Sequence, residues 1–443
     1  MSATARWTMP GRIEVLGKHT DYGGGRVLVC AVDRGVTVHA ERIDGPAGTL
    51  QASTDAYPGM LRLAAGTAPD LPPGHWGRYV HTVVERLGAN FGPLPAARLT
   101  ITSDLPPASG MSSSSALLTG TALALADLAD LPATEAWTSQ IPDRVALAGY
   151  AASIENGKTF GALAGRPGVG TSGGSLDHTG MLAGHDGMIS YAEFDPMQIL
   201  DQVALPEGWS FVVAVSGVLA EKTGAAQASY NRGPALLGQI LERWNRETGR
   251  ADDSLQGALR SLVREDLEAP LAEDETRWEP LRRLAAEGAE RDRLDQFLLE
   301  SAVLVPRAHR ALRGGDLDAL AAAVDASQRL AETHLGNQVP ETIALVRHAT
   351  ALGARAASSF GAGFGGSVWA LVPTPDADAF AADWIDRYRA AGTAPSVASA
   401  LVTRPGAPGR RVEPVAGRVD LGGTSGLSRA PDGVPTQRLP NDE

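Results

Sequence analysis

The sequence has one cysteine, no long apolar run and a deficit of positive charge, and each shortage excludes a class of protein. Cys30 alone cannot form an internal disulfide or a cysteine-based zinc cluster, and the apolar run VLVCAV around it predicts a small buried side chain. A chain without disulfides suits a reducing compartment. No run reaches the roughly eighteen apolar residues that span a bilayer, and the N-terminal segment lacks the apolar core of a signal peptide. We therefore expect a cytoplasmic protein.

The charge balance argues against polyanionic partners. Lysine and arginine number 39 against 51 aspartates and glutamates, so the formal net charge is -12. Such a chain does not attract nucleic-acid phosphates or anionic lipid, and any phosphate that it binds must be held by a local site. We expect small-molecule ligands and a monomer, without nucleic acid or membrane as a partner.

The length of 443 residues, with 43% hydrophobic content, exceeds what one ordinary core holds and predicts two lobes. Strand-like and helix-like segments mix without an internal repeat, which favours an α+β or α/β enzyme. We assign residues 1–205 to an N-terminal lobe and residues 206–405 to a C-terminal α+β lobe. Residues 406–443 are rich in proline and glycine with few large apolar residues, which predicts a disordered tail.

Periodicity indicates the individual elements. Strands are expected over residues 26–32, 35–40 and 97–103, and near residues 209, 354, 366 and 396. Helices are expected over residues 79–87, 112–129, 224–245, 254–266, 291–313, 317–333 and 342–352.

Three segments carry residues suited to chemistry. GRIEVLGKHTDYGGG at residues 11–25 packs Arg, Lys, His and Asp into an expected turn-rich segment, which suits either a site for a hydroxyl-rich ligand or a solvated loop. SGMSSSSA at residues 109–116 lies between a strand and a helix, where free backbone N–H groups and small side chains let a polyphosphate approach. It is not a Walker A loop, and a serine-rich helix cap is the alternative. SSFGAGFGGSVWALV at residues 358–372 permits close backbone approach, or is simply a glycine-rich hairpin.

In this order, the three segments resemble the signatures of the GHMP small-molecule kinases, and the first looks like the galactokinase signature. The resemblance spans about residues 8–405. The matching positions are Gly11, Arg12, Gly17, His19, Thr20, Asp21 and Tyr22 in the first segment, Gly110, Met111, Ser112, Ser113 and Ser114 in the second, and Gly361, Ala362, Gly363, Phe364, Gly365 and Gly366 in the third.

The resemblance implies a two-lobed α+β fold, with an N-terminal mixed-sheet lobe bearing helices and a ferredoxin-like C-terminal lobe. It implies an ATP-dependent sugar 1-kinase that uses Mg²⁺, with galactose as the best single substrate. Asp177 resembles the general base for the anomeric hydroxyl, and Arg12 the residue that orients it and offsets charge on the transferring group. Without the resemblance, Asp177 would be an ordinary turn residue.

The remaining site residues also follow from the resemblance. The positions expected to hold the sugar are Lys18, His19, Asp21, Gly174 and Tyr230. Those expected to hold the ATP phosphates are Ser109, Gly110, Met111, Ser112, Ser113, Ser114 and Ser115. Ser114 and Glu155 resemble the pair that binds the metal, although Glu155 by itself would be taken for a solvated helix residue.

Two residues depart from the family pattern. Glu14 stands where asparagine is usual, and Lys18 stands where an acidic residue usually precedes the histidine and helps hold the sugar. One hypothesis is that the Lys18 ammonium admits a sugar with a carboxylate, such as a uronic acid. The competing explanation is an internal ion pair between Lys18 and Glu14. The stretch from Glu155 to Asp177 is also longer than is typical of the family, and the insertion at residues 157–173 forms either a flap over the site or a surface excursion.

Other functions stay open at this point. A related enzyme would phosphorylate another sugar or a uronic acid at C1. A catalytically silent sugar sensor would keep the cleft, but the complete set of Arg12, Ser114, Glu155 and Asp177 argues against it. A mevalonate- or homoserine-type kinase is weakened by the HTDY segment, which suits hydroxyl recognition.

Overall fold

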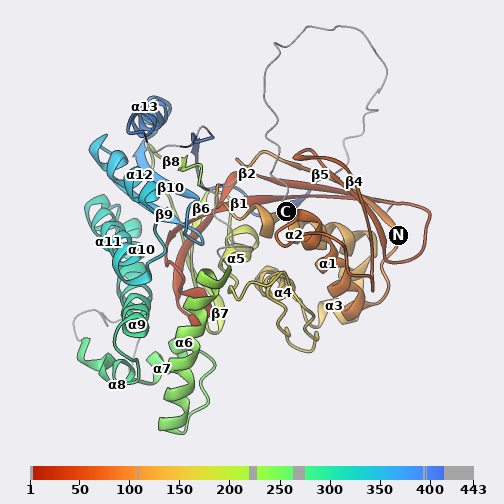
Figure 1. Cartoon of the computed structure of the whole chain (residues 1–443), viewed down its shortest axis with the longest axis horizontal. Coiled ribbons are helices and arrows are strands. Elements are labelled where there is room, and N and C mark those ends of the chain that lie inside the picture. The colour runs from red at the N-terminus through yellow and green to blue at the C-terminus, as the bar shows by residue number, and fades with distance from the viewer. Residues whose placement is uncertain are drawn as a thin grey trace, which may run out of the picture. The chain divides into compact units, whose positions relative to one another are not determined.

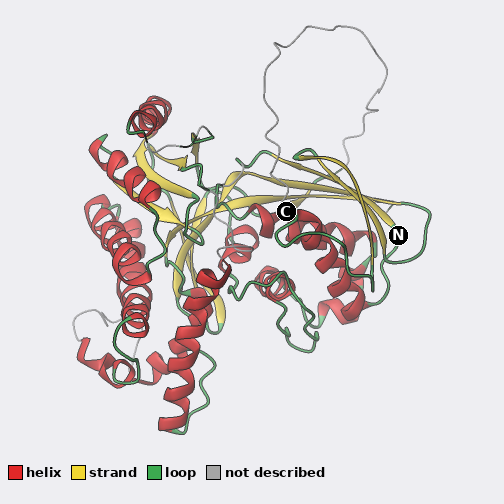
Figure 2. Ribbon diagram, in the orientation of Figure 1, coloured by secondary structure: helices red, strands yellow, loops and turns green. Residues whose placement is uncertain are grey.

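The computed structural model describes residues 3–106, 109–218, 227–262, 275–392, 395 and 397–413. Residues up to Val412 form one compact unit (Figure 1). As predicted, this unit has α+β content, with two β-sheets that pack against helices (Figure 2). Within the described ranges, no helix is long and apolar enough to cross a bilayer.

The larger sheet has eight strands. Their order is β12-β1-β2-β5-β3-β4, with β6 beside the first part of β2 and β7 beside β6. The β3–β5 pair is parallel and the other pairs are antiparallel, so the sheet is mixed, as predicted for the N-terminal lobe. The strands are β1 (Thr4–Leu16), β2 (Arg26–Arg42), β3 (Thr49–Thr54), β4 (Tyr57–Ala64), β5 (Ala97–Ser103), β6 (Met188–Phe194), β7 (Met197–Ala204) and β12 (Arg410–Arg411).

The first strand was not predicted, and the second is longer than predicted. The segment expected to be turn-rich from residue 11 is strand as far as Leu16, so Arg12 and Glu14 lie on β1. The two strands expected over residues 26–40 are one strand, β2, because Asp33 and Arg34 are exposed polar residues within a continuous strand rather than a turn. Side chains two apart on a strand share a face, so Arg12 and Glu14 point the same way.

Helices cover the larger sheet beside β1 and β2. They are α1 (Trp76–Phe91), α2 (Ser113–Leu128), α3 (Glu135–Thr138), α4 (Arg144–Asn156) and α5 (Leu176–Leu182), with short 3-10 turns η1 (Asp21–Gly23) and η2 (Leu131–Ala133). The predicted order of strand, serine-rich loop and helix is confirmed, because β5 leads through residues 104–112 into α2. Alanine and leucine fill α2, and most of its residues are buried because it lies between the sheet, α1 and α4.

The smaller sheet has four antiparallel strands in the order β11-β8-β10-β9. The strands are β8 (Trp209–Val215), β9 (Ala356–Phe360), β10 (Ser367–Pro373) and β11 (Ser399–Thr403). The helices that pack on it are α11 (Leu317–Leu330), α12 (Pro340–Ala351) and α13 (Ala377–Ala390). The glycine-rich segment joins β9 to β10, so it is the turn of an antiparallel hairpin.

The other helices follow β8 along the chain. They are α6 (Gln227–Thr248), α7 (Leu255–Leu262), η3 (Glu275–Trp278), α8 (Glu279–Arg282), α9 (Ala289–Leu299), η4 (Glu300–Leu304), α10 (Val305–Gly314), η5 (Ala331–Leu335) and η6 (Thr374–Asp376). The helix predicted over residues 291–313 is α9 and α10 joined by the π-helical turn η4. Parts of two predicted helices, residues 224–226 and 263–266, lie outside the described residues.

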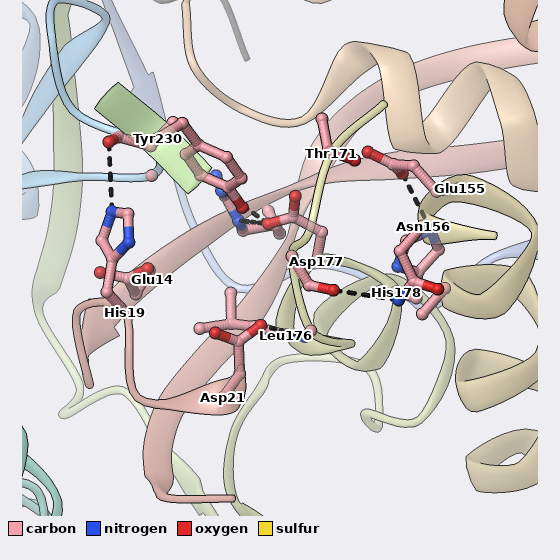
Figure 3. A pocket seen from close by; sticks show the side chains of 16 residues that line it. Glu14, His19, Asp21, Glu155, Asn156, Thr171, Leu176, Asp177, His178 and Tyr230 are labelled. Carbon is pink, nitrogen blue, oxygen red and sulfur yellow. Dashed lines mark hydrogen bonds and ion pairs between the residues drawn. The ribbon is translucent and has the colours of Figure 1, made fainter. Parts of the chain in front are cut away.

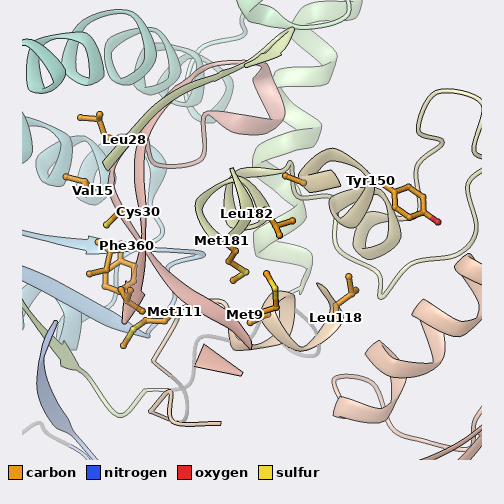
Figure 4. Packing of buried hydrophobic residues seen from close by; sticks show 14 of the residues in the cluster. Met9, Val15, Leu28, Cys30, Met111, Leu118, Tyr150, Met181, Leu182 and Phe360 are labelled. Carbon is orange, nitrogen blue, oxygen red and sulfur yellow. The ribbon is translucent and has the colours of Figure 1, made fainter. Parts of the chain in front are cut away.

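Buried side chains from both sheets form a common core, and Figure 4 shows the part where Met111 and Phe360 pack near β1 and β2. The predicted burial of Cys30 is confirmed, since its side chain is 1% exposed and burial raises the pKa of its thiol to about 12. The predicted lobe boundary at residue 205 falls between β7 and β8, and the division into lobes remains a prediction.

The start of the predicted tail is wrong. Residues 406–412 lie against β2 and α5: Gly406 N–H donates to the Ala31 carbonyl of β2, and Gly409 N–H donates to the Met181 carbonyl of α5. β12 then pairs with β1. Low apolar content misled the prediction because backbone hydrogen bonds hold this segment. Residues 414–443 lie outside the described part of the chain.

Candidate active site

A pocket lies where β1, the turn after it, α4, α5, α6 and the glycine-rich hairpin meet (Figure 3). Its lining residues are Arg12, Glu14, His19, Asp21, Ala152, Glu155, Asn156, Thr171, Gly173, Gly174, Leu176, Asp177, His178, Tyr230, Gly361 and Ala362. Residues separated by more than 340 positions therefore share one pocket. The structure brings together these predicted site residues: Arg12, His19, Asp21, Glu155, Gly174, Asp177 and Tyr230.

Arg12 and Asp177 form a buried ion pair in this pocket. Nε and Nη2 of Arg12 lie 2.8 and 2.7 Å from Oδ1 of Asp177, and Nη1 donates to the Gly110 carbonyl at 2.6 Å. Arg12 is 1% exposed and Asp177 9%. Charge-assisted bonds of this length hold a carboxylate in one orientation. The predicted relationship between the two residues is therefore present in the geometry.

The serine-rich segment contacts two pocket residues through Ser115. Its hydroxyl donates to Glu155 Oε2 at 2.7 Å and lies 3.5 Å from Asp177 Oδ2. Ser114 and Glu155 are the predicted metal-binding pair, but the serine that contacts Glu155 in this structure is Ser115. The helix α2 begins at Ser113, and its first turn directs Ser115 toward α4. The assignment of Ser114 to a metal site stays a prediction.

The loop before α2 contains two residues with a left-handed backbone, as anion-binding turns often do. Gly110 and Ser112 have φ values of 64° and 59°, in the left-handed region, which turns successive N–H groups toward one side. The hydroxyl of Ser112 is buried and has no hydrogen-bond partner among the described residues. The loop is hydrogen-bonded to β10, because the Ser367 hydroxyl donates to the Ser109 carbonyl at 2.6 Å.

The glycine-rich hairpin contacts both other motifs. A Cβ on Gly361 would lie 3.0 Å from the Gly110 carbonyl and 3.3 Å from Nη2 of Arg12, and the φ of Gly361 is +81°. The next residue, Ala362, has its carbonyl 3.1 Å from Nε2 of His19. Glycine is required at 361 because the Arg12 guanidinium and the serine-rich loop approach its backbone there. The three sequence motifs thus form one site.

The opposite wall of the pocket carries polar groups suited to hydroxyls. Asp21 accepts a hydrogen bond from Leu176 N–H at 3.3 Å, and a Cβ on Gly174 would lie 2.5 Å from Asp21 Oδ2. The ring of Tyr230 lies 5.7 Å from that of His19, centroid to centroid. Carboxylate, imidazole and phenol groups around a small pocket can accept from and donate to a polyol.

Lys18 does not line the pocket, which contradicts the predicted sugar contact. Its ammonium donates to the hydroxyls of Ser327 at 2.9 Å and Ser358 at 2.7 Å, in α11 and β9. Burial lowers its pKa, although the carboxylates of Glu300 and Glu14 oppose that shift. The alternative Lys18–Glu14 ion pair is absent from the described residues, whose ion pairs do not include Glu14. The positive φ of His19, 57°, turns the chain so that His19 faces the pocket and Lys18 faces away.

Glu14 and His178 are pocket residues whose roles the sequence did not predict. Glu14 is 4% exposed, and burial raises the pKa of its carboxyl to about 7 despite the nearby charges of Arg12 and Lys18. His178 Nε2 lies 3.2 Å from Glu155 Oε2. The signal for Glu14 is its spacing of two residues from Arg12, which places it on the same face of a strand. A turn-rich interpretation of residues 11–25 hides that signal.

The segment of residues 157–173 forms part of the pocket wall, since Thr171 and Gly173 line the pocket. Hydrogen bonds hold both ends of this segment. Arg86 donates to the Lys158 carbonyl at 2.9 Å, and Asn231 of α6 accepts from Ser172 N–H at 3.0 Å. The segment is therefore neither a detached flap nor a pure surface excursion.

Comparisons with known proteins agree with this arrangement. The family models described as GHMP kinases N terminal domain, galactokinase galactose-binding signature and GHMP kinases C terminal match residues 78–164, 2–42 and 308–390. A Streptomyces coelicolor galactokinase is 30% identical over 418 residues, which cover 92% of this chain and 94% of that relative. A Mycobacterium bovis galactokinase is 28% identical over 377 residues, 84% of this chain and 89% of the relative.

Solved structures show the same fold. The Lactococcus lactis galactokinase, whose crystal structure is described as complexed with galactose, matches with a TM-score of 0.74 at 21% identity, over 92% of this chain and 95% of that one. An L. major mevalonate kinase matches with a TM-score of 0.53 at 16% identity, over 92% and 97%. The predicted GHMP kinase fold is confirmed. Given the match to the Streptomyces relative over nearly the whole length of both chains, this chain belongs to the galactokinase family of the GHMP kinases.

Proposed function

We propose that this protein is a galactokinase, which transfers the γ-phosphoryl group of ATP to the anomeric hydroxyl of galactose and yields galactose 1-phosphate and ADP. The observation that carries the proposal is the buried Arg12–Asp177 pair in a pocket whose other polar groups include His19, Asp21 and Tyr230. Its curated relatives from Streptomyces coelicolor and Mycobacterium bovis carry the same name.

In the proposed mechanism, Asp177 accepts the proton of the anomeric hydroxyl as the sugar oxygen bonds to the γ-phosphorus and the bond to ADP breaks. Phosphoryl transfer depends on positioning and charge stabilisation more than on strong base catalysis. Arg12 fixes the direction of the Asp177 carboxylate and brings positive charge beside the serine-rich loop, through its bond to Gly110. His19, Asp21, Gly174 and Tyr230 would orient the sugar.

The ATP phosphates would lie on the loop of residues 109–115, whose left-handed turn and helix start offer N–H groups. Ser115 and Glu155 supply hard oxygen donors 2.7 Å apart, and this donor set fits Mg²⁺, which takes few protein ligands and completes its shell with phosphate and water. No group of three or more His, Cys, Asp or Glu side chains suited to a metal occurs among the described residues, so a metal there would need those phosphate ligands. When bound, Mg²⁺ would neutralise charge on the phosphates.

The alternatives have less support. The uronic acid alternative depended on Lys18, whose ammonium lies on Ser327 and Ser358 instead of in the pocket. A silent sensor has no need of the Arg12–Asp177 pair. We also keep the prediction of a cytoplasmic protein, which rests on the single cysteine.

An ADP-release assay over galactose, galacturonate, arabinose, N-acetylgalactosamine and glucose tests the proposal, with Asp177→Asn as the control. We expect galactose to give the highest kcat/KM, and nuclear magnetic resonance of the product to show phosphate on C1. ADP release with none of the sugars would favour the sensor, and a preference for galacturonate would favour the uronic acid kinase.

A further inference from the structure

Glu14 is a buried carboxylate of the pocket that the mechanism above does not use. It lies on β1, lines the pocket (Figure 3) and is 4% exposed. Its Oε1 atom has no hydrogen-bond partner within the described part of the chain. Polar groups in protein interiors are almost always hydrogen-bonded, so an unpartnered oxygen on a carboxylate that lines a pocket points to a donor from a ligand.

The nearby cations do not supply that donor. Arg12 directs its guanidinium at Asp177 and Gly110, and the ammonium of Lys18 lies on two hydroxyls in other elements. The remaining charged groups near Glu14 are the carboxylates of Glu300 and Asp21, which cannot donate when ionised. Glu14 therefore lies near charged groups of both signs, but its Oε1 atom still lacks a hydrogen-bond donor.

We propose that Glu14 is a specificity-determining residue that accepts a hydrogen bond from a sugar hydroxyl distant from the one that is phosphorylated. The inference deepens the proposed function and rests on it. A neutral sugar supplies O–H donors, whereas a uronic acid would bring a second carboxylate to this wall. Glu14 thus selects neutral sugars over sugar acids.

The position of Glu14 on β1 indicates which part of the sugar it meets. Arg12 marks the reacting end through its contact with Asp177. Glu14 lies two residues further along the same face, or about 6.6 Å at the usual rise of a strand. That separation is comparable to the width of a pyranose ring. Glu14 should therefore contact the hydroxyl on C3, C4 or C6, and not the one on C2 beside the anomeric centre.

The experiment measures kcat and KM of the full-length enzyme with galactose and with its 2-, 3-, 4- and 6-deoxy derivatives. The principal variant is Glu14→Met, which keeps the length of the side chain but removes both acceptors. Glu14→Gln keeps one acceptor oxygen and serves as the conservative variant. The matched control is Glu41→Gln on β2, a carboxylate that pairs with Arg98 and does not line the pocket.

We expect Glu14→Met to raise the KM for galactose at least tenfold with kcat within about threefold, and Glu14→Gln to recover part of the loss. The wild type should be less active with one of the 3-, 4- or 6-deoxy sugars than with galactose. Glu14→Met should have the same activity with that deoxy sugar as with galactose, because the side chain and the sugar hydroxyl form one interaction that either change removes. The preference for galactose over galacturonate should fall at least tenfold in Glu14→Met. Glu41→Gln should match the wild type, and melting temperatures report whether each variant folds.

Failure of this inference is distinct from failure of the proposed function. An active wild type whose galactose KM is unchanged in Glu14→Met overturns the role of Glu14 alone. The role of Glu14 is also overturned if the variant and the sugar change interact only for the 2-deoxy sugar. The same holds if Glu14→Met loses activity equally with every deoxy derivative. A wild type that phosphorylates no neutral sugar overturns the proposed function and this inference together.

Discussion

Arg12 holds Asp177 by one oxygen: Nε and Nη2 of the guanidinium both lie against Oδ1, at 2.8 and 2.7 Å. The other carboxylate oxygen, Oδ2, faces the start of α2, where Ser115 Oγ lies 3.5 Å away. One oxygen thus anchors the carboxylate, and the second is presented toward the loop proposed to hold ATP. This asymmetry is what a base needs if it is to meet a hydroxyl beside a phosphoryl group.

Replacement of Asp177 tests that arrangement. Asp177→Asn keeps the size of the side chain but removes the proton acceptor and the charge that pairs with Arg12. We expect kcat to fall by about 10²- to 10⁴-fold, the usual contribution of general base catalysis, with the KM for galactose changed much less. Steady-state kinetics with coupled ADP detection measure this. A kcat within threefold of the wild type would show that Asp177 is not the base.

Ser115 contacts Glu155 in the structure, whereas the family resemblance assigns Ser114 to the metal, and substitution of each serine tests which of them serves the metal site. Ser115→Ala removes the hydroxyl that lies 2.7 Å from Glu155, so we expect the Mg²⁺ concentration for half-maximal activity to rise about tenfold, or about 1.4 kcal/mol. Ser114→Ala should have a smaller effect. Titration of Mg²⁺ at saturating ATP and galactose gives both values, and a larger effect for Ser114→Ala would restore the family-based assignment.

Glu14 makes stability depend on pH. Burial raises the pKa of its carboxyl from 4.5 to about 7 in the folded protein. Because the pKa is higher in the folded protein, protonation of Glu14 stabilises the fold. Its contribution to the free energy of unfolding is complete below about pH 4.5, and this contribution, about 3 kcal/mol, is lost as the pH rises to 7. Glu14→Gln lacks this titration. Its melting temperature relative to the wild type should therefore increase between pH 4.5 and pH 7, measured by thermal denaturation without sugar. A constant difference would contradict the prediction.

Lys18 should matter for stability and not for sugar binding. Lys18→Met fills the same space but removes the ammonium from Ser327 and Ser358 and its charge from the vicinity of Glu300. We expect the free energy of unfolding to fall by about 1–3 kcal/mol, because buried partners lose their donor. The KM for galactose should stay within about twofold, since a side chain outside the pocket makes no sugar contact to lose. A large rise in KM with unchanged melting temperature would return Lys18 to the sugar site.

Gly174 tests the wall opposite the ion pair. A Cβ there would lie 2.5 Å from Asp21 Oδ2, closer than real contacts allow, so Gly174→Ala must displace the Asp21 carboxylate. We expect the KM for galactose to rise about tenfold, since a misplaced binding group loses roughly one good hydrogen bond. Gly238→Ala is the matched control, because nothing lies within 4 Å of its Cβ position and its φ, like that of Gly174, is outside the left-handed region. Equal kinetics of Gly174→Ala and wild type would exclude Asp21 from sugar binding.

The sequence by itself determined the family and most of the site. Residues of the first and third motifs line one pocket together with Asp177, Glu155 and Tyr230, and the second motif contacts two of these residues through Ser115. The residue types of the motifs follow from local needs: glycines for close backbone approach, serines at a helix start. Strand, loop and helix around residues 97–128 are local features too, and they were predicted from periodicity and propensity. Backbone turns, helix starts and short strands depend on neighbouring residues, so they can be predicted from the sequence of one segment.

Tertiary structure alone decided which neighbouring side chain faces the pocket. Ser114 and Ser115 are adjacent residues of α2, and only the packing of α2 against α4 directs Ser115 to Glu155. The left-handed backbone at His19 turns Lys18 away from the pocket, and the extension of β1 through Leu16 turns Glu14 toward it. Side-chain direction changes by about 100° per residue in a helix and by about 180° in a strand, so a boundary misplaced by one residue reverses a contact.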